Sequence, residues 1–366
     1  HAELASQLVV QDFRGRMKPM HSQTRELLRK FLGSEAFQGK NADQVILTMY
    51  SNPEGWYGIP IIKMGKHPKI ADILNIPNQK LASYKDFFNP DGSYKLKSFV
   101  AETNNKRPAD RGIFDKNLIK VDERVNIVNM VFSGYFLKVI PVEHDANNTW
   151  VSTSTHSMQN VDLTVANKFF TAYRSALSKA IETQDFTLSD KIMSELSQYQ
   201  QQVGVAVMPA TAKIKAEIFL TNLNVFTRLA FFNFMLGLIF LALLFFSVFK
   251  PKTNISKIQK VLTGFFAVGL IFHLVGLGLR WYVSGRAPWS NGYESMIYIA
   301  FTSSLAGFLF SRKSIGAMAA TLVLSGTVLL IALLSYLDPE ITPLVPVLNS
   351  YWLTIHVSLE AGSYGF

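Results

Sequence analysis

Long runs of residues without any charge dominate the C-terminal part of the chain. Four such runs lie between charged residues, and they hold 21, 19, 17 and 24 residues. A helix needs about 20 predominantly apolar residues to cross the hydrocarbon core of a bilayer. The sequence therefore predicts four complete membrane spans and one truncated span. The predicted spans are about 228–249, 260–281, 294–311 and 314–337, and the truncated one starts near 350.

Residues 1–222 carry charged side chains throughout, which is typical of a water-soluble domain. Apolar residues at helical spacing indicate that this domain is mostly helical. We therefore expect a mainly α fold, namely a polytopic α-helical membrane protein with a domain at 1–222 and a membrane domain at 223–366. Helices are predicted at 22–33, 157–182, 189–203 and 210–229, a short strand within 56–64, and either one long helix or a helix followed by a strand at 126–142.

The charges between the spans predict the orientation of the chain in the membrane. The connection 250–260 carries four lysines and no acid, and the next basic link carries Arg312 and Lys313. Lysine and arginine are enriched in cytoplasmic loops. We therefore expect both connections on the cytoplasmic side and residues 1–222 on the extracytoplasmic side.

Both ends of the chain and its cysteine content bear on what it can contain. It begins at His1 rather than Met and stops within an apolar run, so we expect both ends to be cuts through a longer protein. It has no cysteine, which excludes a disulfide framework, a thiolate metal site and a cysteine nucleophile within these residues. Four histidines of the first domain lack the spacing of a metal site, and we expect them at the surface. They are His21, His67, His144 and His156.

The connection between the second and third spans gathers aromatic and charged side chains at one membrane surface. Asn291 and Glu294 have the spacing of a helix cap whose third residue reaches back, so capping is one interpretation. The other is a ligand pocket, because guanidinium groups pair with carboxylates and aromatic rings stack on planar ligands. A planar, anionic, largely apolar ligand would suit this segment. The candidate pocket residues are Arg280, Arg286, Trp289, Asn291, Tyr293 and Glu294, with Trp352 from the fifth span.

Two histidines lie within the predicted spans. His273 shares one helix face with Arg280, and a histidine in a membrane faces protein, cofactor or water rather than lipid. We take it as a secondary candidate, with helix packing as the alternative. His356 and Glu360 lie one turn apart on a polar stripe near the outward end of the fifth span. Imidazole is a common iron ligand, and Glu360 could orient its second nitrogen; the alternative is an interfacial histidine near a solvated acid.

Two membrane motifs resemble a known family. "GLGLRWYVSGRAPWSNGYESM", followed by two more spans and "YWLTIHVSLEAGSYGF", is similar to the first part of the CcsA half of the System II cytochrome c synthases of the CcsBA type. In the first domain, "VQDFRGRMKPMHSQTRELLRKFLG" and "KVDERVNIVNMVFSGYFLKVIPV" resemble the ResB/CcsB-like extracytoplasmic part. The resemblance covers nearly the whole chain. It implies a multi-pass protein of the bacterial cytoplasmic (inner) membrane with a periplasmic domain.

The resemblance also implies an activity in cytochrome c-type biogenesis. Such synthases bind haem b, transport it through the membrane and join its vinyl groups to the thiols of a Cys-x-x-Cys-His motif on an apocytochrome c. His356 matches the first outward-facing axial ligand of the haem iron, whereas the second and the Trp-rich WWD segment would lie beyond Phe366. Glu360 is not expected in the family pattern. The implied partners are apocytochrome c, haem, the lipid bilayer and thiol-reducing proteins, with no nucleic acid.

Two other functions stay open at this point. One is a haem exporter or carrier without ligase activity, and the other is a membrane sensor with an outer ligand-binding domain. The large first domain favours the synthase, because it could present the apocytochrome, and the short cytoplasmic connections disfavour a sensor. We expect residues 1–366 alone to be inactive and to bind haem weakly or not at all.

Overall fold

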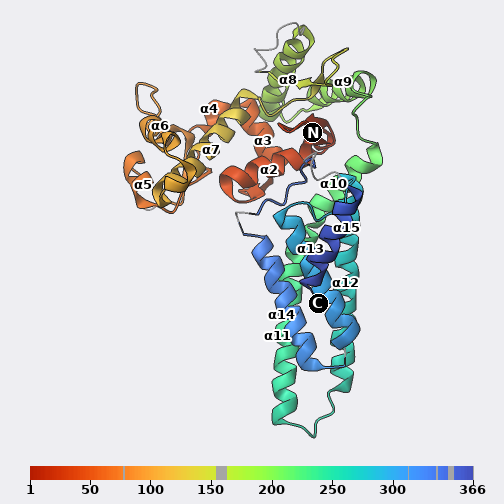
Figure 1. Ribbon diagram of the computed structural model, residues 1–366. Coiled ribbons are helices and arrows are strands. Elements are labelled where there is room, and N and C mark those ends of the chain that lie inside the picture. The colour runs from red at the N-terminus through yellow and green to blue at the C-terminus, as the bar shows by residue number, and fades with distance from the viewer. Residues whose placement is uncertain (77–78, 154–162, 312, 335–336, 345–349, 366) are drawn as a thin grey trace. The chain divides into compact units, whose positions relative to one another are not determined.

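The computed structural model describes the chain except for residues 77–78, 154–162, 312, 335–336, 345–349 and 366. Contacts divide it into two compact units, His1–Ala210 and Thr211–Phe366. The predicted mainly α membrane fold is confirmed, since helices make up most of both units (Figure 1). Among the described residues, three helices are long and apolar enough to cross a membrane: Thr211–Phe249, Ser256–Ser284 and Ile315–Ala332.

The first unit is a helical domain in which short antiparallel strand pairs connect the helices. The pairs are β1 with β2, β3 with β4, β5 with β6 and β7 with β8. The elements run α1 (Ala2–Ser6), β1 (Val9–Gln11), β2 (Met17–Pro19), α2 (Met20–Leu32), β3 (Ala36–Phe37), β4 (Lys40–Asn41), α3 (Ala42–Ser51), α4 (Pro53–Trp56), β5 (Ile62–Lys63), α5 (Pro68–Leu74), β6 (Leu81–Ala82), α6 (Lys97–Asn105), α7 (Ile113–Ser133), β7 (Ile140–Pro141), β8 (Trp150–Val151), α8 (Thr164–Thr183) and α9 (Thr187–Val203).

Local sequence signals explain where these helices end. Gly33 and Gly134 take left-handed conformations, with φ of 82° and 74°, and they end α2 and α7. Glycine adopts this conformation without a steric penalty. The segment 126–142 is therefore a helix followed by a strand, one of the two predicted alternatives. The predicted helix 189–203 is confirmed as α9, and 157–182 corresponds to α8, with its first residues outside the described part of the chain.

The prediction that the histidines of the first unit lie at the surface is wrong for His21. Its Nδ1 lies 2.7 Å from Asp43 Oδ2, and Thr24 Oγ1 donates to the other Asp43 oxygen at 2.5 Å. All three side chains are buried, and buried polar groups are stable when they are hydrogen-bonded to each other. His67 is half-buried and His144 is exposed, whereas His156 lies outside the described residues.

The second unit is a helical bundle, with six helices among its described residues. They are α10 (Thr211–Leu223), α11 (Val225–Phe249), α12 (Ser256–Ser284), α13 (Gly292–Ser311), α14 (Ile315–Ala332) and α15 (Tyr351–Ser363). Helices α11 to α15 lie in the five segments predicted as spans, although α14 ends at Ala332 rather than near 337, and the membrane crossing of α13 and α15 stays a prediction. Asn224, in a left-handed conformation, separates α10 from α11. Because α10 packs on α12, it belongs to this unit, and the boundary comes before the expected 222/223.

Glycine lets the central helices α11 and α14 approach each other closely. A Cβ added to Gly237 would lie 2.7 Å from the backbone nitrogen of Val323, and one added to Gly326 would lie 2.6 Å from that of Phe234. Small residues at helix contacts are typical of membrane bundles, in which packing replaces the hydrophobic effect as the driving force. Beside this contact, Asn233 Nδ2 donates to Ser325 Oγ at 3.2 Å.

The two basic connections lie at the same end of the bundle. Gln259 Nε2, in the first turn of α12, donates to the carbonyl of Lys313 between α13 and α14 at 3.3 Å. This arrangement agrees with successive helices running in opposite directions (Figure 1). The opposite end of the bundle therefore carries the connection between α12 and α13, where the sequence placed most of its candidate residues.

Candidate functional site

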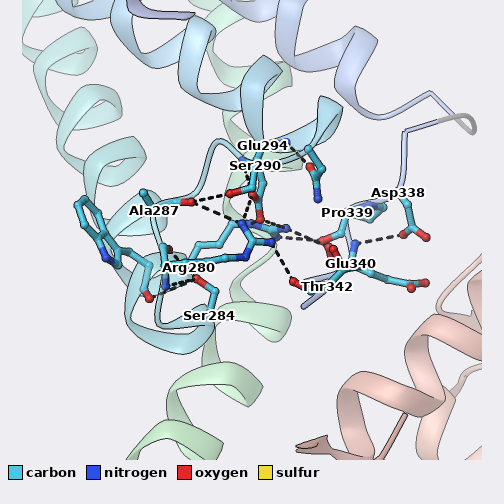
Figure 2. A network of polar contacts seen from close by, with 12 residues as sticks. Arg280, Ser284, Ala287, Ser290, Glu294, Asp338, Pro339, Glu340 and Thr342 are labelled. Carbon is cyan, nitrogen blue, oxygen red and sulfur yellow. Dashed lines mark hydrogen bonds and ion pairs between the residues drawn. The ribbon is translucent and has the colours of Figure 1, made fainter. Parts of the chain in front are cut away.

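A buried carboxylate with two arginines forms the centre of this second end (Figure 2). Glu294, in the first turn of α13, has a side chain that is 0% exposed. Its Oε1 accepts from Arg280 Nε at 3.0 Å, and its Oε2 accepts from Arg286 Nη1 at 2.7 Å. The backbone N–H of Ser290 also donates to Oε2, at 2.9 Å. A buried charge needs such pairing, because its desolvation is otherwise uncompensated.

The same two arginines bind the backbone of the connection between α14 and α15. Arg280 Nη1 donates to the carbonyl of Pro339 at 2.9 Å, and its Nη2 donates to that of Glu340 at 3.1 Å. Arg286 Nη2 donates to the carbonyl of Thr342 at 2.9 Å. The planar, multi-donor guanidinium group suits such a role, since it can bind a carboxylate and carbonyls at once. We call Arg280, Arg286 and Glu294 the clamp.

Asn291 and Tyr293 support the clamp from the start of α13. Asn291 Oδ1 accepts from the backbone N–H of Glu294 at 2.8 Å, which is the bond of a helix N-cap. Glu294 does not complete the expected reciprocal bond to Asn291, because its carboxylate turns to Ser290 and the arginines. The ring of Tyr293 is buried, 5.3 Å from the Arg280 guanidinium. Both guanidinium groups thus already pair with one carboxylate inside the protein.

Trp289 connects this region to α15. Its indole Nε1 donates to the carbonyl of Thr354 at 3.2 Å. Its ring lies 4.8 Å from that of Tyr298 on α13 and 5.6 Å from that of Trp281 on α12. Buried or half-buried indoles usually find an acceptor for their N–H. The two ring contacts fix Trp289 against α12 and α13, and its indole N–H joins them to α15.

His356 lies on the face of α15 that points away from this contact. Its side chain is 74% exposed, and Trp352, one turn earlier, is 77% exposed. Gly362 and Ala361 lie on the other side of the helix, where Gly362 faces Tyr298 and Ala361 is buried. Each residue turns an α-helix by about 100°, so His356 and Thr354 point in nearly opposite directions. The structure therefore separates His356 and Trp352 from the clamp.

His356 and Glu360, which the sequence placed one turn apart, lie close to each other on α15. The imidazole Nε2 lies 3.7 Å from Glu360 Oε2, which is within ion-pair distance and longer than a hydrogen bond. Both side chains are exposed, so the imidazole is accessible to a ligand. The exposed imidazole is suited to haem iron, because one of its nitrogens can serve as an axial ligand. Among the described residues, no group of three His, Asp or Glu side chains could hold a metal ion by itself.

His273 is buried between α12 and α13. Its Nε2 lies 3.0 Å from the carbonyl of Ile297, so this nitrogen carries the proton and donates. Within the described part of the chain, its Nδ1 has no hydrogen-bond partner. The rings of Phe226 and Phe301 lie 5.7 and 5.4 Å away. The observed contacts agree with the helix-packing alternative, in which the imidazole joins two helices.

Sequence reasoning missed the connection around 339–342. Its three bonded groups are backbone carbonyls, which every residue type carries, so the sequence contains no residue-specific signal for them. An indirect signal was available in the charges. Glu294 faces two arginines, and a single carboxylate leaves guanidinium N–H groups that require further acceptors.

Known proteins share parts of this sequence. Residues 289–366, which begin at Trp289 and include His356, match the family described as Cytochrome C assembly protein. The chain resembles cytochrome c biogenesis proteins. Protein NrfI of Wolinella succinogenes is 38% identical over 363 residues, which are 98% of this chain and 40% of that protein. The cytochrome c biogenesis protein CcsA of Synechococcus sp. (strain CC9311) is 38% identical over 143 residues, or 37% of this chain and 44% of that protein.

A third relative, the cytochrome c biogenesis protein CcsA of Trieres chinensis, is 33% identical over 142 residues, or 36% of this chain. The chain thus spans less than half the length of these curated relatives. Together with the membrane helices, the matches support a membrane protein of cytochrome c biogenesis.

Proposed function

We propose that the chain forms part of a System II-type cytochrome c synthase, which holds haem b at the outer membrane face and promotes its attachment to Cys-x-x-Cys-His apocytochromes. The observation that carries the proposal is His356. It is an exposed histidine on α15, and it lies within the residues that match the cytochrome c assembly family. Under this proposal, its imidazole occupies one axial position of the haem iron, and haem is a substrate.

The chemistry requires positioning more than reactive groups from the protein. Each thioether forms when a substrate S–H adds across a haem vinyl group: a C–S bond forms at one carbon and the proton goes to the other. The addition needs no thiol of the enzyme, which agrees with a chain that lacks cysteine. The substrate thiols must be reduced, which accounts for thiol-reducing partners. A ligand that fixes the haem lets the vinyl groups meet the thiols at high effective concentration.

Glu360 would act on the ligand rather than on the haem. Its carboxylate faces Nε2 of His356 at 3.7 Å. A carboxylate that accepts a hydrogen bond from one imidazole nitrogen orients the ring and raises the basicity of the other nitrogen, and a small rotation of these exposed side chains would close the 3.7 Å gap to such a bond. We therefore assign Glu360 an orienting role, which differs from the small or apolar residue expected at this turn of the family pattern.

The proposed membrane orientation follows from the basic end of the bundle. The lysine-rich connection 250–260 and Lys313 lie at that end, and they are assigned to the cytoplasmic side. The end that carries Trp289 and the clamp then faces outward, as does the first unit. In the proposal the first unit presents the apocytochrome to haem held by His356.

Haem titration of the chain in lipid nanodiscs tests the ligand assignment. Because His356 supplies one axial ligand, added imidazole should complete a six-coordinate, low-spin haem spectrum. We expect His356→Ala to weaken apparent haem affinity at a fixed imidazole concentration by about 10-fold or more, as loss of metal-site partners commonly does. His144→Ala, at an exposed histidine of the first unit, is the matched control. Equal titrations of His356→Ala and the unmodified chain would show that the assignment is wrong.

A graft tests ligase function. Residues 289–366 replace the corresponding segment of the Synechococcus CcsA protein, and covalent haem on a co-expressed Cys-x-x-Cys-His cytochrome is measured after denaturing electrophoresis. We expect maturation with the graft and loss of it with His356→Ala in the graft. Haem binding by the chain without any maturation by the graft would instead favour a haem carrier.

A further inference from the structure

We propose that Glu294 is a positioning residue: through the clamp and Trp289 it holds α15 and determines the direction in which His356 faces. The ligand role of His356 in this inference rests on the proposed function, whereas the mechanical coupling of Glu294 to α15 does not. Glu294 lies on α13 and His356 on α15, so the coupling must pass through intervening groups. The structure shows two routes.

The first route is the described part of the connection that precedes α15, residues 337–344. These residues form no helix or strand, so helix or sheet hydrogen bonds do not define their path. The carbonyls of Pro339, Glu340 and Thr342 instead bind the two clamp arginines at 2.9 to 3.1 Å. Glu294 holds both arginines in place. Loss of its charge would leave the buried Arg280 and the partly buried Arg286 without their counterion, which is strongly unfavourable.

The second route passes through the segment before α13. Glu294 Oε2 accepts from the N–H of Ser290, and the preceding residue, Trp289, donates its indole N–H to the carbonyl of Thr354. Thr354 lies in the first turn of α15, two residues before His356. A rotation of α15 by one residue position, about 100°, would carry this carbonyl away from the indole. The bond therefore specifies the rotation of α15.

The remaining contacts of α15 are limited, which makes these two routes important. The helix is 13 residues long and packs on α13 near Gly362 and Tyr298. Of its residues, only Ala361 is buried. Its packing on α13 continues just past the helix, where Gly365 lies against Thr302 and Ser303, but little buried surface of the helix itself resists rotation or tilt. The clamp and Trp289 supply the missing constraint.

Spin-label distances test the coupling, because a chain without cysteine accepts unique labels. The reporter pair is Val268→Cys on α12 with Leu359→Cys on α15, and the control pair is Val268→Cys with Phe245→Cys on α11; all three side chains are exposed. In nanodiscs, double electron–electron resonance should give one narrow distance for each pair in the unmodified chain. We expect Glu294→Gln to broaden or shift the reporter distance and to leave the control distance unchanged.

Trp289→Phe separates the two routes, since it keeps the ring and removes the N–H that binds Thr354. We expect it to broaden the reporter distance less than Glu294→Gln does, because the first route persists. An unchanged reporter distance in Glu294→Gln would overturn the proposal. Broadening of both pairs would also overturn it, because Glu294 would then support the whole bundle rather than α15.

The haem and imidazole titration provides the functional readout. We expect Glu294→Gln to weaken apparent haem affinity by about 10-fold, as supporting groups of metal ligands commonly do. Failure of the two proposals is distinguishable. If His356→Ala leaves haem binding unchanged, the proposed ligand is wrong, and the distance measurements still decide whether Glu294 positions α15.

Discussion

The close crossing of α11 and α14 depends on Gly326. We expect Gly326→Ala, which adds one methyl group, to destabilise the bundle strongly. A Cβ at Gly326 would lie 2.6 Å from the backbone nitrogen of Phe234 and 2.8 Å from its Cα. Such distances are shorter than van der Waals contact. Both atoms belong to the backbone, so no side-chain rotation can relieve the overlap, and the two helices must move apart.

The magnitude of this effect can be estimated from the contacts that separation would weaken. Overpacking in a close-packed interior usually costs about 1–3 kcal/mol. At this crossing the neighbouring Ser325 Oγ lies 2.9 Å from the carbonyl of Ala300, and it also accepts from Asn233. We therefore expect Gly326→Ala to be at the upper end, about 3 kcal/mol. For a unit of this size, that loss corresponds to a fall in Tm of roughly 6–12 °C.

Thermal unfolding in nanodiscs, followed by circular dichroism, measures the change. Gly278→Ala in α12 is the matched control, because a Cβ there would meet no atom within 4 Å. Alanine is a better helix former than glycine by about 1 kcal/mol, so this control should leave Tm unchanged or raise it slightly. Equal Tm values for the two variants would refute the close approach of α11 and α14.

Two further substitutions test the first unit and the bundle interior. Hydrogen bonds, first from the N–H of Gly112 and then from Lys106, hold the pKa of Asp115 below its usual range. The contribution of this carboxylate to stability is therefore present above the unfolded pKa of about 3.9 and is lost as pH falls through the folded pKa. Asp115→Asn should flatten the fall of Tm between about pH 5 and pH 2, and an unchanged fall of Tm in this range would contradict the argument. His273→Leu removes a donor to Ile297 together with an Nδ1 that has no partner among the described residues. These opposing effects should leave the unfolding free energy within about 1 kcal/mol of that of the unmodified chain, and a loss above about 3 kcal/mol in chemical denaturation would contradict this.

The helical elements and the position of His356 could be predicted from the sequence. Apolar runs and helical spacing are local properties, and a backbone in an apolar medium has few alternatives to a helix, so the five predicted apolar segments form helices α11 to α15. Spacing of four residues also places His356 and Glu360 on one helix face, where their nitrogen and oxygen lie 3.7 Å apart.

Only the tertiary structure decided which helix faces meet. It buried His21 against Asp43, and it directed Arg280 and Arg286 to Glu294 and to backbone carbonyls rather than toward an open pocket. It also placed His356 on the side of α15 opposite the Trp289 contact. Periodicity places residues on a face of their own helix, but the partner of that face depends on packing between segments far apart in the chain, and backbone acceptors leave no residue-specific trace in a sequence.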